Sequence, residues 1–94
     1  MTAPLFLEGD DVEIHTIAYI EDNSALPDGE LSNEIVGLTK HGDVLEIVSM
    51  DYESGWTLNR ADRAIKPGWI YNLMDNEGNR VWHINEEDLR LRKH

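Results

Sequence analysis

The chain has 94 residues, 40% of them apolar, which supports one compact domain and excludes an intrinsically disordered chain. Cysteine is absent, so disulfides, thiol nucleophiles and cysteine metal sites are excluded. The formal net charge is −11, and a charge of this size repels nucleic acid and attracts basic partners.

Acidic residues are unevenly distributed along the chain. No Lys or Arg precedes Lys40, whereas nine acidic residues do. From Lys40 onward, eight basic residues nearly balance ten acidic ones. One part of the surface is therefore expected to carry a negative potential. A second interpretation is that the acidity only keeps the protein soluble, and the sequence leaves both open.

The N-terminal arm, residues 1–9, is expected to precede the main fold. It lacks the basic start of a signal peptide, and no apolar run in the chain reaches membrane-spanning length. We therefore expect a cytoplasmic protein with no membrane segment. Residues 12–20 then alternate in polarity with a period of two, which predicts the first strand.

A long acidic loop, residues 21–42, is predicted after this strand. Pro27-Asp28-Gly29 is typical of a turn, because proline fixes φ and glycine accepts a left-handed conformation. Residues 34–38 are expected to add a short paired segment inside the loop. Residues 42–50 give the clearest strand, with Leu45, Ile47 and Ser49 on one face.

The next stretch, residues 51–67, has weaker signals. Residues 56–59 predict a brief strand, and residues 60–66 have a helix-forming composition but are too few for a stable helix alone. This segment contains the internal basic cluster of Arg60, Arg63 and Lys66.

A β-hairpin is predicted over residues 68–84, with its turn at 75–78. Alternation places Trp69 and Tyr71 on one face, and we expect Trp69 at the rim of a binding surface and Trp82 in the core. A single helical turn capped by Asn85 is expected over residues 85–88, followed by a last strand over 89–92 and a tail at 93–94.

Several stretches resemble SH3 domains over residues 10–92. They are residues 38–48, in which Gly42-Asp43 opens a strand, Gly68-Trp69-Ile70-Tyr71, and residues 77–91. The resemblance implies an all-β fold: a small SH3-like barrel of five to six strands, with a long acidic loop after strand 1 and a one-turn helix before the last strand. The chain also resembles bacterial SH3-like barrels that serve as accessory subunits.

The chain departs from the SH3 pattern at the residues that hold proline-rich peptides. Only Ala18-Tyr19 remains of the usual Ala-Leu-Tyr-Asp-Tyr, and residues 85–88 replace the Pro and Tyr near the short helix. The resemblance therefore does not imply a proline-rich ligand.

No catalytic or cofactor motif is found. The four histidines lack metal-ligand spacing, and Asp10, Asp11 and Glu13 lack the spacing of a calcium loop. Serine-hydrolase, phosphate-loop and dinucleotide motifs are absent as well. We expect a protein that is not an enzyme and has no cofactor or metal.

These observations predict a non-enzymatic interaction module that binds a basic protein surface or segment. Carboxylates in the acidic loop would steer the partner and neighbouring aromatic side chains would anchor it. The expected partner-binding residues are Tyr19, Glu21, Asp22, Asp28, Glu30, Trp56, Trp69 and Tyr71.

Two other functions stay open. One is an inhibitor of phage or mobile-element type that mimics nucleic acid and blocks a basic nucleic-acid-binding enzyme. The other is an accessory subunit of a larger enzyme complex. Direct nucleic-acid binding is disfavoured by the charge, and the sequence carries no signal for an oligomeric state.

Overall fold

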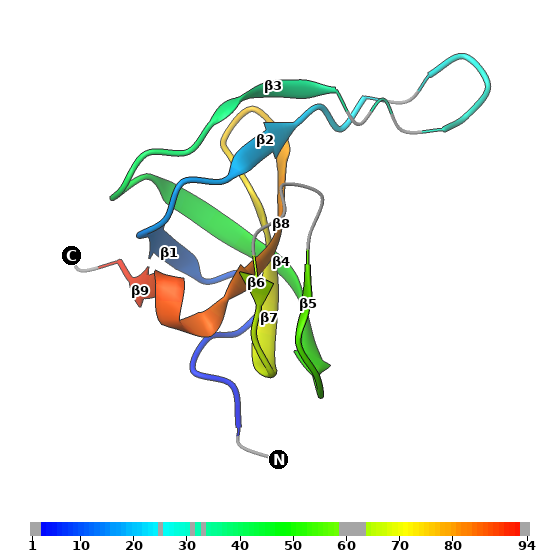
Figure 1. Ribbon diagram of the computed structural model, residues 1–94. Coiled ribbons are helices and arrows are strands. Elements are labelled where there is room, and N and C mark those ends of the chain that lie inside the picture. Colours follow the sequence, from blue (N-terminus) through cyan, green and yellow to red (C-terminus); the bar gives the residue numbers. More distant parts are fainter. Residues whose placement is uncertain (1–2, 25, 31, 33, 59–63, 93–94) are drawn as a thin grey trace.

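The computed structural model describes residues 3–24, 26–30, 32, 34–58 and 64–92. Within these residues, seven strands form one antiparallel sheet that curls strongly into a half-barrel, in the order β3-β2-β8-β7-β4-β1-β9 (Figure 1). The strands are β1 (Asp11–Ile14), β2 (Tyr19–Glu21), β3 (Ile35–Leu38), β4 (Val44–Glu53), β7 (Gly68–Met74), β8 (Arg80–Asn85) and β9 (Leu89–Leu91).

A second, two-stranded sheet is formed by β5 (Thr57–Leu58) and β6 (Ala64–Ile65), and a 3₁₀ turn at Glu86–Asp88 leads into β9. The all-β class, the 68–84 hairpin, the pairing of residues 34–38 and the turn before the last strand are confirmed. The predicted count of five to six strands is wrong, since the described residues place seven in the main sheet alone.

The excess arises mainly because the predicted strand over residues 12–20 is two strands, β1 and β2. The chain turns between them, and buried Thr39 holds this turn. The Thr39 hydroxyl accepts a hydrogen bond from the Ala18 N–H and donates one to the Thr16 carbonyl, both at 2.9 Å. Alternation alone does not reveal this break, because it depends on a residue more than twenty positions away.

Two local predictions near the small sheet need correction. Residues 60–63 of the predicted helical segment lie outside the described residues, while Ala64–Ile65 form a strand. Asn85 precedes the 3₁₀ turn, but its side chain makes no capping hydrogen bond. It accepts a hydrogen bond from the Lys66 N–H at 3.0 Å and donates one to the Ala64 carbonyl at 3.1 Å. Asn85 thus joins β6 to the end of β8.

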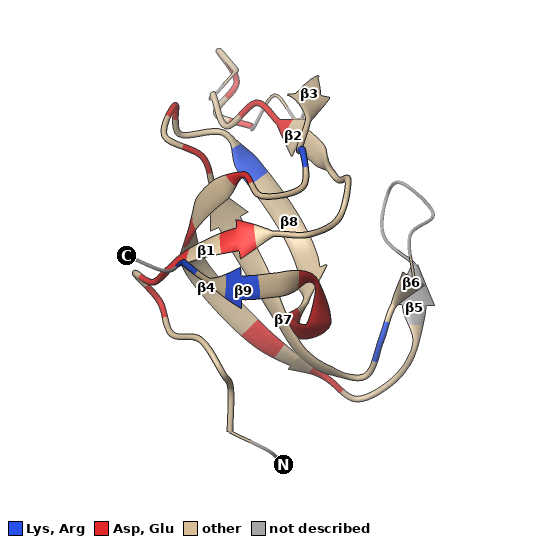
Figure 2. Cartoon of the chain, turned by 90° about the vertical axis from the view of Figure 1, so that its left-hand side faces the viewer, with Lys and Arg blue, Asp and Glu red and all other residues tan. Residues whose placement is uncertain are grey.

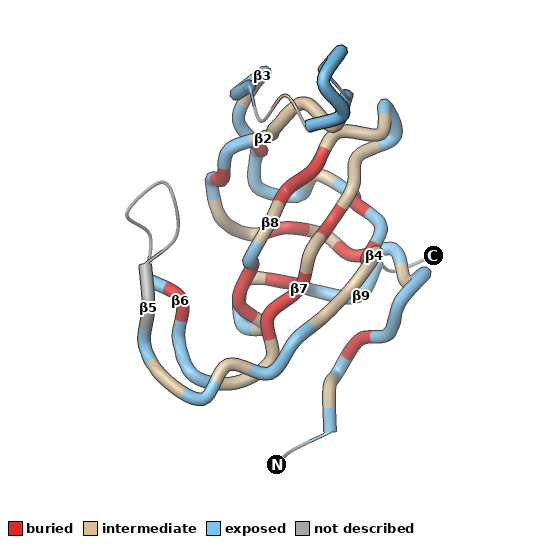
Figure 3. The backbone as a smooth tube through the Cα atoms, turned by 90° about the vertical axis from the view of Figure 1, so that its right-hand side faces the viewer, coloured by how far each residue is buried: buried red, intermediate tan, exposed pale blue. Residues whose placement is uncertain are grey.

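Two bulges shape the core. Opposite β7, strand β4 carries an extra residue between Ile47 and Ser49, and β8 carries one between Val81 and Ile84. Bulges bend a strand and raise its local twist, which suits a sheet that curls on itself. Many of the residues along β7 and β8 are buried (Figure 3). The main core cluster contains Phe6, Val12, Ile14, Ala18, Leu45, Ile47, Tyr71, Leu73, Val81, Ile84 and Leu89.

The bulges also change which side chains face the core. On β4, Leu45 and Ile47 share the buried face, but Met50 rather than Ser49, which was predicted to share it, packs against the cluster beyond the bulge. On β8, Val81 and Ile84 are both buried although they are three residues apart. The prediction that Trp82 lies in the core is therefore wrong. Trp82 is half-buried outside the cluster, beside Arg80.

Asn72 connects the two bulges. Its amide donates a hydrogen bond to the Ser49 hydroxyl at 2.9 Å, and its carbonyl oxygen accepts one from the His83 N–H at 3.1 Å. His83 has a φ of 61°, an uncommon conformation for a residue with a side chain. The Asn72 side chain thus ties β4 to β8 across β7, where both strands are irregular.

We predict that Asn72→Ala lowers the free energy of unfolding by about 1–2 kcal/mol, because two hydrogen bonds of about 1 kcal/mol each are lost. Urea unfolding followed by tryptophan fluorescence measures this. Asn76→Ala, at an exposed position of the β7–β8 turn, is the control and is expected to change stability little. Equal stability of the two variants would contradict a role for Asn72 in holding the bulges.

Candidate functional site: an acidic hairpin

The acidic hairpin, residues 19–38, comprises β2, β3 and the segment that joins them, and it projects from the half-barrel (Figure 1). Its sequence contains no Lys, Arg or His. Red acidic segments mark the described part of this hairpin at the top of Figure 2. Its carboxylates are those of Glu21, Asp22, Asp28, Glu30 and Glu34.

Backbone hydrogen bonds continue the pairing of β2 and β3 toward the tip of the hairpin. They join Asp22 N–H to the Glu34 carbonyl at 2.7 Å, Ser32 N–H to the Ser24 carbonyl at 2.9 Å and Leu26 N–H to the Glu30 carbonyl at 2.6 Å. The described residues of the predicted acidic loop between 21 and 38 thus pair as a two-stranded ribbon. Because these pairs fix the path of the chain, the carboxylates occupy defined places along it.

The tip of the hairpin is the predicted Pro-Asp-Gly turn. The Gly29 N–H donates to the Leu26 carbonyl at 2.8 Å, and Gly29 has a φ of 88°, in the region that glycine tolerates best. The Asp28 carboxylate accepts a hydrogen bond from the Glu30 N–H at 3.0 Å. Asp28 and Glu30 are both exposed, so the tip presents two carboxylates to solvent.

Asp22, near the half-barrel end of the hairpin, is stabilised in its ionised form. The hydroxyl of Ser24 donates to its carboxylate at 2.6 Å and the Ser24 N–H donates at 2.9 Å. These hydrogen bonds, the hydroxyl's first, lower the pKa of Asp22 below its ordinary value. Asp22 therefore keeps its negative charge throughout the neutral range.

Arg80, the first residue of β8, anchors the base of the hairpin. Its side chain is 1% exposed. The guanidinium donates to the Asn23 side-chain oxygen at 3.2 Å and lies 3.9 Å from the Glu21 carboxylate. It also stacks over the Trp82 ring, 5.6 Å from the centroid. Strand pairing places Glu21 directly beside Arg80, so the hairpin is attached to the half-barrel through this buried cation.

We predict that Arg80→Met lowers the free energy of unfolding by about 1–3 kcal/mol, because a half-buried carboxylate and an amide lose their partner. Amide hydrogen exchange should also accelerate in residues 19–23 and 34–38. Arg92→Met, at an exposed arginine, is the matched control. Unchanged exchange in the hairpin of the Arg80 variant would contradict the anchoring role.

The outer face of the hairpin is apolar. Tyr19 on β2 is paired with Leu38 on β3, and paired residues point their side chains to the same face. Tyr19 is 41% exposed and Leu38 is 54% exposed. Val36 is 53% exposed as well. Acidic and apolar side chains thus occur together on one projecting element.

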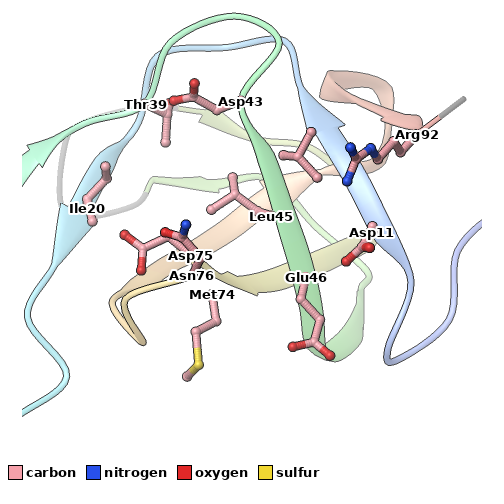
Figure 4. Close-up of a pocket in the computed structure, with 11 residues that line it drawn as sticks. Asp11, Ile20, Thr39, Asp43, Leu45, Glu46, Met74, Asp75, Asn76 and Arg92 are labelled. Carbon is pink, nitrogen blue, oxygen red and sulfur yellow. The ribbon is translucent and has the colours of Figure 1, made fainter. Parts of the chain in front are cut away.

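A cavity of about 570 Å³ lies beside the base of the hairpin (Figure 4). Ile20 from β2, Leu45 from β4 and Met74 from β7 supply its apolar wall. Asp43 and Asp75 line it as well. In Figure 4 Arg92 and Asp11 lie on the side opposite Ile20 and Asp75. An apolar wall with carboxylates suits a Lys or Arg side chain, which buries its aliphatic stem while its charge meets an acid.

The predicted aromatic residues Trp56 and Trp69 are separated from the hairpin. Trp69 pairs with Tyr52 near the start of β7, and their rings meet edge to face at 5.4 Å. Glu21 lies beside Arg80, which pairs with Met74 at the other end of β7. Five residues of strand span about 17 Å. Trp56 is 67% exposed and precedes β5.

Tyr71 shares the inner face of β7 with Trp69, as alternation predicts, but it is 0% exposed and belongs to the core. Its ring meets Phe6 edge to face at 5.5 Å. Its hydroxyl donates to the Glu86 carboxylate at 2.6 Å and accepts a hydrogen bond from the Phe6 N–H at 3.4 Å. The Leu5 N–H donates to the same carboxylate at 3.1 Å. Tyr71 therefore holds the N-terminal arm from within the core.

Burial, followed by the hydrogen bond to Glu86, raises the pKa of Tyr71 well above its ordinary value. The unfolded chain ionises this phenol at about pH 10, before the folded chain does. The contribution of Tyr71 to the free energy of unfolding is thus present below pH 10 and falls as the pH rises further.

We predict that Tyr71→Phe abolishes this alkaline loss of stability, measured by urea unfolding from pH 8 to 11, whereas Tyr19→Phe keeps it. A wild-type-like alkaline slope in Tyr71→Phe would contradict the prediction.

Within the described part of the chain, no three His, Asp or Glu side chains come together in a way that holds a metal ion. The ring centroids of His15 and His41 are 6.2 Å apart, and the Glu13 Oε1 atom lies 3.3 Å from His15 Nε2. No helix among the described residues is long and apolar enough to cross a membrane.

The structure thus brings together five of the residues predicted to bind a partner: Tyr19, Glu21, Asp22, Asp28 and Glu30. Sequence reasoning missed Arg80 and the cavity residues Ile20 and Asp75. A lone arginine beginning a strand directly after a turn was the available signal for Arg80. Comparison of the chain with models of protein families, with curated proteins and with solved structures finds no match.

Proposed function

We propose that the protein is a non-enzymatic interaction module: an SH3-like barrel whose acidic hairpin binds a basic segment or surface of another protein. The SH3-like assignment is supported by the hairpin inserted between β1 and β4 and by the 3₁₀ turn directly before β9. Both are features that the sequence resemblance implies.

The binding proposal rests on one observation: the acidic hairpin projects from the half-barrel and holds negative charges at ordered positions. Five carboxylates lie on a hydrogen-bonded ribbon without a basic residue in its sequence. Carboxylates held in place on a projecting element create a local field that accelerates the approach of a cationic partner. A ribbon fixed at its base by Arg80 also loses less conformational entropy on binding than a free loop.

The cavity beside the hairpin adds to this proposal. Ile20 extends from β2 into the cavity wall, so a partner bound along the hairpin has the cavity next to it. A Lys or Arg of the partner would pack its stem on Leu45 and Met74 and its charge near Asp75. Apolar burial would then supply affinity, and the carboxylates selectivity.

Charge reversal tests the proposal. Glu30→Lys with Glu34→Lys reverses two exposed hairpin carboxylates, whereas Glu8→Lys with Glu77→Lys reverses two exposed ones elsewhere. Both double variants change the net charge equally. We predict that the hairpin variant binds a partner captured from the source cell about tenfold more weakly and with a shallower salt dependence. The control should bind almost as wild type does. Equal binding by both variants would overturn the proposal.

A second candidate, an inhibitor that mimics nucleic acid, is favoured by one observation. Carboxylates continue from the hairpin to the neighbourhood of the cavity, where Asp11, Asp43, Glu46 and Asp75 are found. Carboxylates spaced over such a surface would take the place of phosphates in the nucleic-acid-binding channel of a basic enzyme. Competition decides between the candidates: a mimic releases DNA or RNA from the captured partner, whereas a module that binds elsewhere forms a ternary complex.

A further inference from the structure

We propose that β3 is a docking edge at which an extended, basic segment of a partner protein, alternating apolar with Lys or Arg residues, adds as a strand. This inference rests on the proposed function and specifies how the acidic hairpin binds. Among the described residues, β3 is a terminal strand of the main sheet, paired on one side only with β2. Edge strands with unpaired backbone groups are templates for strand addition.

The backbone of β3 has groups that point outward. The Thr39 N–H, directly after the strand, donates to the Ala18 carbonyl at 2.9 Å and so faces β2. Backbone N–H groups alternate sides along a strand, which turns that of Leu38 away from β2. A strand arriving from outside meets this group in the plane of the sheet.

The side chains of β3 do not protect its edge. Natural edges are usually guarded by a lysine, a proline or an inward-pointing charge. The sequence Ile35-Val36-Gly37-Leu38 contains none of these, and its three larger side chains are exposed. Strand β3 carries one extra residue, Val36, opposite β2, so the regular part of the edge is its Gly37-Leu38 end. An incoming strand that places an apolar residue opposite Leu38 would cover this surface.

Charge determines the chemistry of the incoming strand. Glu34 directly precedes β3, and its carbonyl accepts a hydrogen bond from the Asp22 N–H at 2.7 Å, so these two acidic residues face each other across the hairpin. Glu34 is exposed, whereas Glu21, on the face of Tyr19 and Leu38, lies 3.9 Å from the Arg80 guanidinium. Residues that alternate with the apolar ones in the arriving strand therefore meet carboxylates, which favours Lys or Arg.

A second copy of this chain is a poorer occupant than such a partner. Pairing of β3 with β3 would set acidic hairpins against each other, at a net charge of −11 for each copy. The other terminal strand of the main sheet, β9, alternates Leu and Arg but has only three residues. The Arg90 guanidinium is also engaged by the Glu87 and Leu89 carbonyls of its own chain, at 2.7 and 2.8 Å.

The test uses two synthetic peptides of one composition, with lysine and valine alternating in the first and grouped into two blocks in the second. Titration calorimetry compares their binding to the wild-type protein. We expect the alternating peptide to bind at least about tenfold more tightly, because only it presents an apolar face and a basic face as a strand. Equal affinities would overturn the docking edge.

Variants then locate the site. Leu38→Pro removes the outward N–H of β3 and should weaken binding of the alternating peptide about tenfold or more. Leu91→Pro is the matched control on β9, since the Arg92 N–H faces β1 and that of Leu91 faces outward. If Leu38→Pro fails to fold, Leu38→Lys replaces it, because an exposed lysine repels the peptide without changing the backbone. Unchanged binding in the folded β3 variant would overturn the proposal.

Two further outcomes separate this inference from the proposed function. If both peptides bind equally and Glu30→Lys with Glu34→Lys weakens both, the acidic hairpin still binds basic segments and only the strand-addition mode is overturned. The second outcome comes from sedimentation of the protein without peptide. If the wild-type protein self-associates and Leu38→Pro abolishes this, the occupant of β3 is a second copy of the chain, and the proposal of a basic partner segment is overturned.

Discussion

The hydrogen bonds of Asn72 secure the irregularity on which the other features depend. They hold β4 and β8 where each strand carries one residue too many for its pairing with β7. On β8 the extra residue lets Val81 and Ile84 both face the core and sends Trp82 outside. Trp82 then covers Arg80, whose guanidinium holds the base of the acidic hairpin. The position of the hairpin thus follows from a bend in the sheet.

The three buried or half-buried aromatic residues of the β7–β8 hairpin have separate roles. Tyr71 fills the core and binds the N-terminal arm through Phe6, whose ring and N–H both contact it. Trp69 packs against the edge of the core and contacts Tyr52. Trp82 covers a cation on the outside. A small half-barrel with little interior volume therefore uses large side chains both inside and outside its sheet.

Much of the architecture could be predicted from local patterns. Alternation located β4, the β7–β8 hairpin and β9, and turn-forming residues located Pro27-Asp28-Gly29. These features depend on neighbours in the sequence. The division of residues 12–20 into two strands depends on Thr39, and the exclusion of Trp82 from the core depends on a bulge opposite Asn72. A period of two carries no information about such distant contacts, so the sequence could not reveal them.

The candidate site could be predicted in part for the same reason. Charge composition located the carboxylates of residues 21–34, because an uneven distribution of acids is visible in the sequence. Of the aromatic residues predicted to bind a partner, Tyr71 is buried and Trp69 lies at the end of β7 far from the hairpin. Register between strands determines which residues are neighbours, and one residue of shift changes every contact.

The paired construction of the acidic hairpin has a consequence for how its length can vary between related proteins. Hydrogen-bonded pairs recur every second residue on each side, at Asp22–Glu34, Ser24–Ser32 and Leu26–Glu30. Insertion or deletion of two residues on both sides would add or remove one pair, moving the Pro-Asp-Gly tip by about 7 Å while every remaining side chain keeps its face. The reach of the two tip carboxylates can thus evolve in discrete steps, with the half-barrel unchanged.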